Sequence, residues 1–320
     1  MSNIRVSTTS EVLERFRIDL LDDVRSRGFT LPREAEIPGN YFDAVVAWQR
    51  LQHRTIHVAP RAVNESRQLL ERQLDPAIQL AIADIRSEFE RGDDLTPRLT
   101  RHFFRTAFND FLFNNFGIHH LHLGLAGAGL DKTKKHTMSG GRSELLFALV
   151  TPTEAYFLDI QDHLAFDSPD VAKALARVAL GYRPDLLEPH VAHGVVHAEQ
   201  TFEDAFRLAK AGFSTVYELD GRFFLTGGTV MDGRVTNGKR AACTSEAAIG
   251  AANLVLTMIV QLVEHVTAYA DELSTVAELR GGAKPQTFDL EVVQVGPSVV
   301  VRDLPSGLLF FNNGRRLGLL

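Results

Sequence analysis

Three histidines lie within four residues of the chain, in a segment that has the pattern of a β-strand. Alternation along the strand IHHLHLGL would place His120 and His122 on one face and His119 on the other. Imidazole accepts and donates protons near neutral pH, so two such side chains on one face predict general acid–base catalysis. His163 ends a later predicted strand that also carries Asp159. If the strands pair as a meander, we expect His163 or Asp159 to approach His120 and His122.

A glycine-rich loop follows the histidine strand and carries cations. Lys132, Lys134 and Lys135 lie on this loop, and Arg142 lies just before the next predicted strand. In RNA cleavage without a metal, such fixed cations would offset the charge that develops on a pentavalent phosphate. The loop does not fit a nucleotide-binding P-loop, because LDKT follows Gly129 where Lys and Ser or Thr should come at once. The segment KKHTMSGGR is also too polar and glycine-rich for the helix that such a loop uses.

Two other interpretations of the histidines stay open. His120, His122 and His163 with Asp159 form a mixture of imidazole and carboxylate that suits Zn or Fe, so a metal-dependent enzyme is the alternative to a cofactor-free one. The histidines can also be half-exposed strand residues without chemistry. The protein would then be a non-enzymatic partner-binding or immunity protein that uses the sheet as a scaffold.

Composition indicates an ordinary globular protein. The 320 residues carry a net charge of −6, which argues against electrostatic binding of nucleic acid by the whole chain. The single cysteine, Cys243, allows neither an intrachain disulfide nor a cysteine-based zinc site, and this fits a reducing cytoplasm. Residues 247–266 are long and apolar enough to span a membrane, but Ser245 and Glu246 begin the segment like a soluble helix. We therefore expect a buried core helix and a cytoplasmic protein without a membrane span.

Helical spacing dominates residues 1–95. Ser10 is the expected cap of a first helix that Gly28 stops, NYFDAVVAWQRLQHR predicts a second helix, and 62–91 a third that Pro76 breaks. Residues 96–182 differ: RLTRHFFRTAFNDFLFNNFG predicts one helix, and the histidine strand, the strands SELLFALV and EAYFLDIQ and a closing helix follow. Residues 183–320 combine a hairpin that turns at Asp220 and Gly221, an apolar helix over about 245–272, and further strands. The sequence thus predicts an α+β protein: a helical N-terminal region, a central helix-plus-antiparallel-sheet unit and a C-terminal α+β domain.

Residues 97–165 resemble the RelE/YoeB-like toxins, small ribonucleases of bacterial toxin–antitoxin systems. The likeness rests on FGIHHLHLG, a loop with an arginine, LLFALV, a short turn, AYFLDI and a terminal histidine. It implies a helical hairpin on a meander sheet, RNA cleavage without a metal, RNA or the ribosome as target, and a protein antitoxin as partner. His163 would stand for the terminal histidine of the YoeB-like toxins and Arg142 for the arginine before the middle strand, where this chain has Glu144. The rest of the chain is similar to larger bacterial proteins without an assigned function.

The leading hypothesis is therefore a toxin-like ribonuclease without a cofactor. Its catalytic residues would be His120, His122, Arg142 and His163, and the loop lysines Lys132, Lys134 and Lys135 would bind the substrate phosphate.

Overall fold

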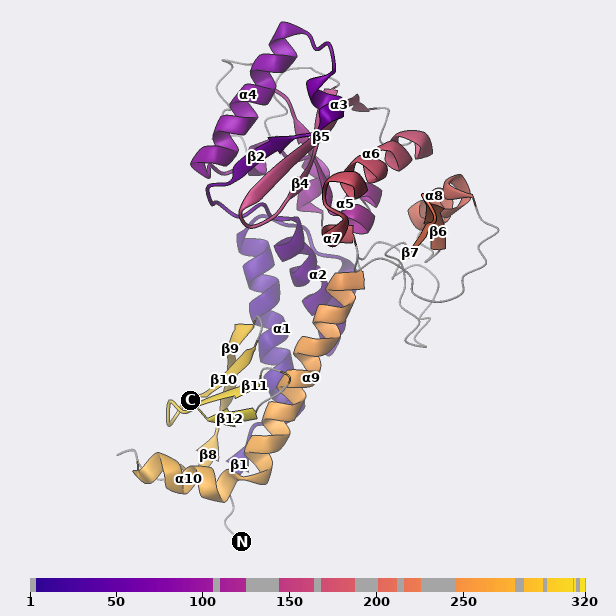
Figure 1. Ribbon diagram of the computed structural model, residues 1–320. Helices are drawn as coiled ribbons and strands as arrows, with labels where there is room; N and C mark the ends of the chain where they lie inside the picture. Colours follow the sequence, from indigo (N-terminus) through magenta and orange to yellow (C-terminus); the bar gives the residue numbers. More distant parts are fainter. Residues whose placement is uncertain are drawn as a thin grey trace. The chain divides into compact units, whose positions relative to one another are not determined.

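The protein has an α+β fold, as the sequence predicts (Figure 1). The computed structural model describes residues 4–105, 110–124, 144–163, 168–187, 201–211, 216–225, 246–279, 285–295, 298–312, 314 and 317–319. The chain divides into two compact units, one built from Met1–Leu51 with Ala247–Leu320 and the other from Gln52–Glu246. These boundaries differ from the three consecutive segments expected, because the two ends of the chain fold together.

The unit that contains the chain ends packs helices against an antiparallel sheet. Strand β1 (Arg5–Val6) pairs in parallel with β8 (Thr287–Phe288), which joins the N-terminal segment to the C-terminal one. The sheet has the order β12-β11-β10-β9. Its strands are β9 (Leu290–Val295), β10 (Val299–Asp303), β11 (Leu309–Asn312) and β12 (Leu317–Leu319), and the helices are α1 (Thr9–Ser26), η1 (Arg33–Glu36), α2 (Tyr41–Arg54, which ends in the other unit), α9 (Glu246–Ala268) and α10 (Ala270–Leu279).

Helix α1 begins two residues earlier than expected. Thr8, not Ser10, is the N-cap, because its side chain accepts the Glu11 N–H while the Glu11 carboxylate accepts the Thr8 N–H at 2.7 Å. This reciprocal pair is a capping box, which satisfies two backbone donors at once. The apolar face that follows packs into the core of the unit, which includes Val12, Phe16, Val45, Met258, Ile259, Leu262, Val301 and Phe310.

The apolar segment expected over about 245–272 forms two helices, α9 and α10, separated at Tyr269. Within the described residues, Gly250–Ala268 is the one helical stretch long and apolar enough to cross a membrane, with a mean hydropathy of 1.4. Its side chains Met258, Ile259 and Leu262 pack against α1 and the sheet. Within this stretch, 39% is buried in the structure, and the cytoplasmic location stays a prediction.

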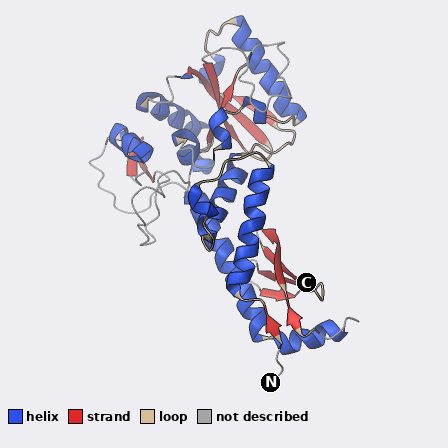
Figure 2. Ribbon diagram, turned by 180° about the vertical axis from the view of Figure 1, so that it is seen from behind, coloured by secondary structure: helices blue, strands red, loops and turns tan. Residues whose placement is uncertain are grey.

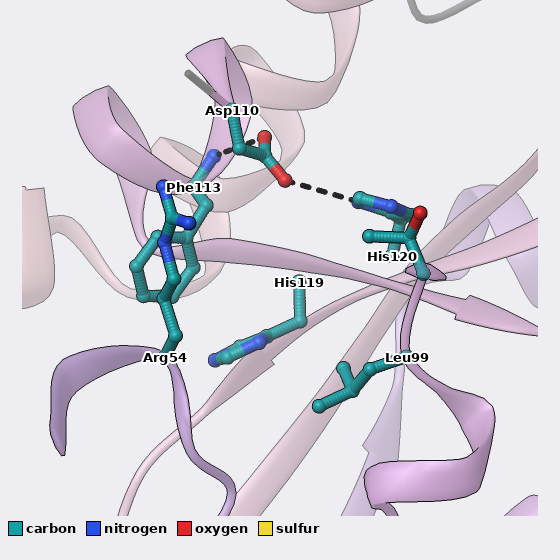
Figure 3. Close-up of a pocket in the computed structure, with 7 residues that line it drawn as sticks. Arg54, Leu99, Asp110, Phe113, His119 and His120 are labelled. Carbon is teal, nitrogen blue, oxygen red and sulfur yellow. Dashed lines mark hydrogen bonds and ion pairs between the residues drawn. The ribbon is translucent and has the colours of Figure 1, made fainter. Parts of the chain in front are cut away.

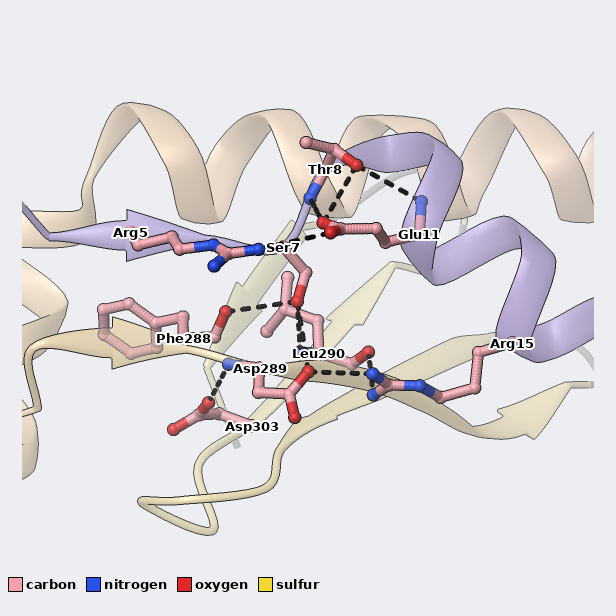
Figure 4. A network of polar contacts seen from close by, with 9 residues as sticks. All are labelled: Arg5, Ser7, Thr8, Glu11, Arg15, Phe288, Asp289, Leu290 and Asp303. Carbon is pink, nitrogen blue, oxygen red and sulfur yellow. Dashed lines mark hydrogen bonds and ion pairs between the residues drawn. The ribbon is translucent and has the colours of Figure 1, made fainter.

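A network of polar contacts holds the chain ends of this unit together (Figure 4). Asp303 is fully buried; its carboxylate accepts the N–H of Asp289 at 2.8 Å and that of Ser306 at 2.9 Å. The Asp289 carboxylate in turn lies 3.0 Å from a guanidinium nitrogen of Arg15 and 3.2 Å from the hydroxyl of Ser7. Helix α1 and strand β9 are therefore joined through one turn that depends on Asp303.

Replacing Asp303 by Ala should destabilise the protein by roughly 2–4 kcal/mol, because two half-buried backbone donors lose their acceptor. The matched control is Asp22→Ala, which removes an exposed carboxylate whose ion pair with Arg25 is worth at most about 1 kcal/mol. Chemical unfolding of both variants measures the difference. Equal, small losses would show that the turn does not depend on the Asp303 carboxylate.

The unit from the middle of the chain is built on a four-stranded sheet between two layers of helices (Figure 2). Strands β3, β4 and β5 form the antiparallel meander that the sequence predicts, and β2 adds to β5 in parallel, in the order β2-β5-β4-β3. The bounds are β2 (Ala62–Glu65), β3 (Ile118–His122), β4 (Glu144–Val150), β5 (Glu154–Asp162), α3 (Arg67–Leu70), α4 (Pro76–Arg91), η2 (Thr96–Arg98), η3 (Arg101–Phe104), α5 (Phe111–Phe116), α6 (Pro169–Tyr182), α7 (Pro184–Leu187), α8 (Phe202–Ala211), β6 (Val216–Leu219) and β7 (Arg222–Leu225).

Each face of this sheet is covered by apolar side chains of different helices. One face packs against α4 through residues such as Ile82, Ile85 and Phe89. The other packs against α5, α6, α8 and the hairpin β6–β7, with Phe147 of β4 among the buried side chains. The hairpin turns at Asp220 and Gly221, as expected, and both have positive φ, the geometry that tight hairpins need.

Two predicted helices are wrong in this unit. Residues 62–65 form strand β2 instead of helix. The backbone stays extended at Ser66, whose N–H donates to Phe157 O at 2.8 Å. The Ser66 side chain then caps α3. The single helix expected over 98–117 is interrupted by the extended residues Arg105 and Asp110, and among the described residues only η3 and α5 remain of it. Pro76, in contrast, begins a helix as its ring geometry allows.

Candidate acid–base site

The histidines of β3 are buried. Their exposed fractions are 9% for His119, 5% for His120 and 6% for His122, so they are not the half-exposed residues of the non-catalytic interpretation. His120 pairs in register with Phe147 of β4 and His122 with Leu145. Their two rings lie on one face, as alternation predicts, with centroids 6.4 Å apart.

His120 has a buried carboxylate as its partner. Asp110 Oδ2 lies 3.2 Å from His120 Nδ1, and Asp110 is only 6% exposed (Figure 3). Asp110 is also the N-cap of α5, where Oδ1 accepts the Phe113 N–H at 3.0 Å. Burial alone would raise the pKa of Asp110, but His120, the Phe113 N–H and Arg54 outweigh burial and hold this pKa below its ordinary value. Asp110 therefore stays ionised beside His120.

Sequence reasoning missed Asp110 because it placed this residue inside a long helix. The signal that identifies it is the segment NDFLF, in which an Asp directly precedes an apolar run and so can serve as an N-cap. The extended backbone of Asp110 ends any helix that precedes it and turns its carboxylate toward β3.

Arg54 supplies a cation beside this pair. It is the last residue of α2, is 5% exposed, and donates from Nη1 to the carbonyl oxygen of Arg105 at 3.2 Å. It shares a small cavity at the β3 edge of the sheet with the Asp110–His120 pair (Figure 3). The cavity has a volume of about 20 Å³, which holds one water molecule or one hydroxyl-sized group. Its lining residues are Arg54, Leu99, Thr100, Asp110, Phe113, His119 and His120.

His119 lines the cavity as a neutral ring. Burial lowers the pKa of His119 to about 4. The Asp110 carboxylate raises this pKa, and it is lowered further by His120, Arg54 and Arg61. The ring contacts Phe113 edge to face, with centroids 4.7 Å apart. His119 is therefore unprotonated at neutral pH and is a poor proton acceptor.

His163 completes a row of histidines. It follows β5 on the exposed surface, and its ring centroid lies 5.9 Å from that of His122. The structure thus brings together His120, His122 and His163, which the sequence singled out from two strands.

The alternative metal site has no support among the described residues. The carboxylate of Asp159 is paired with Arg72, and it also accepts the Ile160 N–H at 2.8 Å and the Gln161 side-chain amide at 2.6 Å. In the part of the chain that the structure describes, no group of three His, Cys, Asp or Glu side chains is arranged to hold a metal ion.

The predicted phosphate-binding residues cannot be placed. Lys132, Lys134, Lys135 and Arg142 lie outside the described residues. Glu144, which stands where the toxin resemblance expects an arginine, begins β4 and pairs in register with Asp162 of β5. The described end of this strand pair therefore carries two carboxylates.

Comparison with protein-family models, with curated proteins and with solved structures yields no match to this chain. The resemblance to the RelE/YoeB-like toxins stays a prediction.

The buried His119 should make stability fall in mild acid. Its pKa is about 4 when folded and about 6.5 when unfolded, so between these values the unfolded chain binds the extra proton. The contribution is fully present above pH 6.5 and is lost as the pH falls to 4, by roughly 3 kcal/mol. Urea unfolding at several pH values should show this loss in the wild type and a smaller one in His119→Gln. The control His57→Gln alters an exposed histidine; equal pH profiles for all three proteins would contradict the assignment.

Proposed function

We propose that the protein is a metal-independent ribonuclease in which Asp110 and His120 act together as the general base. The observation that carries the proposal is the 3.2 Å contact between the buried Asp110 carboxylate and His120 Nδ1, in a cavity that Arg54 also lines. A carboxylate 3.2 Å from Nδ1 favours the tautomer that carries the proton on Nδ1, and we propose that Nε2 then serves as the basic nitrogen. The same division of work between Asp and His orients the base in other hydrolytic sites.

Arg54 takes the role that the sequence analysis gave to Arg142. A buried guanidinium close to the base offsets the negative charge that grows on phosphate oxygens during cleavage, and it does so more strongly than in water because the surroundings are of low dielectric.

The size of the cavity favours a macromolecular substrate. Sites that enclose small molecules have volumes of roughly 300–1,000 Å³, whereas this cavity holds one hydroxyl-sized group. Leu99, Thr100 and Phe113, which line it, are half-buried, so a polymer at the surface would insert a single group between them. The ribose 2′-hydroxyl is such a group, and it distinguishes RNA from DNA.

We propose the following reaction. His120 Nε2 takes the proton of the 2′-hydroxyl, and the resulting oxygen attacks the adjacent phosphorus. The bond from phosphorus to the 5′-oxygen breaks, and that oxygen takes a proton from water. The products are a 2′,3′-cyclic phosphate and a 5′-hydroxyl, and the proton on His120 must leave before the next turnover.

Cleavage of a labelled RNA mixture in EDTA tests the proposal. The wild type should cleave RNA but not DNA of the same sequence. His120→Gln should lose at least about 100-fold in rate, and Asp110→Asn should also lose rate, because acid–base catalysis contributes 10²–10⁴-fold. His57→Gln is the control and should cleave like the wild type. Unfolding curves establish that each variant is folded, and undiminished cleavage by folded His120→Gln would refute the assignment.

A non-enzymatic role is the second candidate, and one observation favours it. Asp110 caps α5 and contacts β3 at the same time, so the pair also serves as a structural tie within a scaffold for a protein partner. In that case folded wild-type protein cleaves no RNA, and Asp110→Asn and His120→Gln change stability alone. Cleavage that EDTA abolishes would instead favour a Zn or Fe enzyme. For either role we propose a cytoplasmic protein.

A further inference from the structure

We infer that His122 and His163 form a proton path that connects the buried His120 to solvent. The inference rests on the proposed function for its catalytic consequence, because a base that takes a proton in each turnover must release it. The path itself rests on the positions of the three rings.

The rings follow one another across the sheet at similar intervals. The ring centroids of His120 and His122 are 6.4 Å apart, and those of His122 and His163 are 5.9 Å apart. At these separations the nitrogens of neighbouring imidazoles are too far apart for a direct hydrogen bond, so we propose that a bridging water carries the proton between them. The row begins at the Asp110 carboxylate, which contacts His120 Nδ1.

Exposure changes only at the outer end of the row. His120 and His122 are 5% and 6% exposed, whereas His163 lies on the surface. Within the described residues, the row joins the buried His120 ring to an exposed side chain.

Two guanidinium groups and one carboxylate lie along the inner part of the row. The inner end holds Arg54 and Asp110, and the Asp110 carboxylate lies 3.2 Å from His120 Nδ1. At His122, the Arg98 guanidinium donates to the backbone carbonyl and is itself paired with Glu88. At the outer end, His163 is exposed, so a proton that reaches its ring can pass to water.

The other groups in the cavity are poor acceptors for the proton on His120. His119 has a pKa of about 4, and the pKa of Asp110 is held below its ordinary value. The proton taken from the 2′-hydroxyl therefore passes from His120 to His122, then to His163, then to water. The leaving 5′-oxygen takes one proton from water, so protons balance over the turnover.

Proton exchange at the His120 ring, measured by ¹⁵N NMR on histidine-labelled protein, tests the path without any substrate. In His163→Gln and in His122→Phe, exchange of the His120 ring N–H with solvent should slow at least about 10-fold relative to wild type. His57→Gln, an exposed histidine outside the row, should leave it unchanged. His163 is exposed, so its substitution should not disturb folding even if His122→Phe does.

An unchanged exchange rate in His163→Gln would overturn the path. Turnover provides the second measurement: RNA cleavage by His163→Gln should slow, and added imidazole should restore it. Slowed exchange without cleavage by the wild type would leave the path standing and refute the proposed function. RNA cleavage by the wild type together with an unaltered exchange rate in His163→Gln would refute the path and leave the proposed function standing.

Discussion

A carboxylate removed from water must be matched by hydrogen-bond donors, and the candidate site is organised around the place where Asp110 meets this requirement. One oxygen accepts the Phe113 N–H in the first turn of α5, and the other lies against His120 on β3. The position of α5 over the sheet, the orientation of the His120 ring and the ionised state of Asp110 all follow from these contacts. Arg54 and the neutral His119 then occupy the remaining wall of a cavity with room for one hydroxyl-sized group.

The same principle holds the other unit together. Asp303 is buried at the end of β10 and accepts the N–H of Ser306 in the following turn and that of Asp289 between β8 and β9, while Asp289 contacts Ser7 and Arg15. The two ends of the chain thus fold as one unit around an apolar core, and the middle of the chain forms the unit that carries the histidines. In both units a single buried carboxylate connects elements that are distant along the chain or differ in type.

The proposed function depends on the His120 ring, which lines a cavity with room for one small polar group. The His120 ring is buried, its partner is ionised, and a cation lies beside it. This combination supports acid–base chemistry on a group presented from outside, for which we propose RNA. The row that continues through His122 to His163 gives such a base a connection to water that does not pass through the substrate.

The sequence by itself determined the α+β class, the meander of β3, β4 and β5, and the shared face of His120 and His122, because strand alternation and turn signals act over a few residues. It also predicted that His163 would approach this face. Only the tertiary structure decided that Asp110 is the partner of His120, that Arg54 lies beside it and that residues 62–65 form a strand. These features depend on contacts between segments far apart in the chain. Neither a capping side chain nor a parallel strand pairing leaves a periodic pattern in the sequence. Each is defined only by its contact with a distant segment of the folded chain.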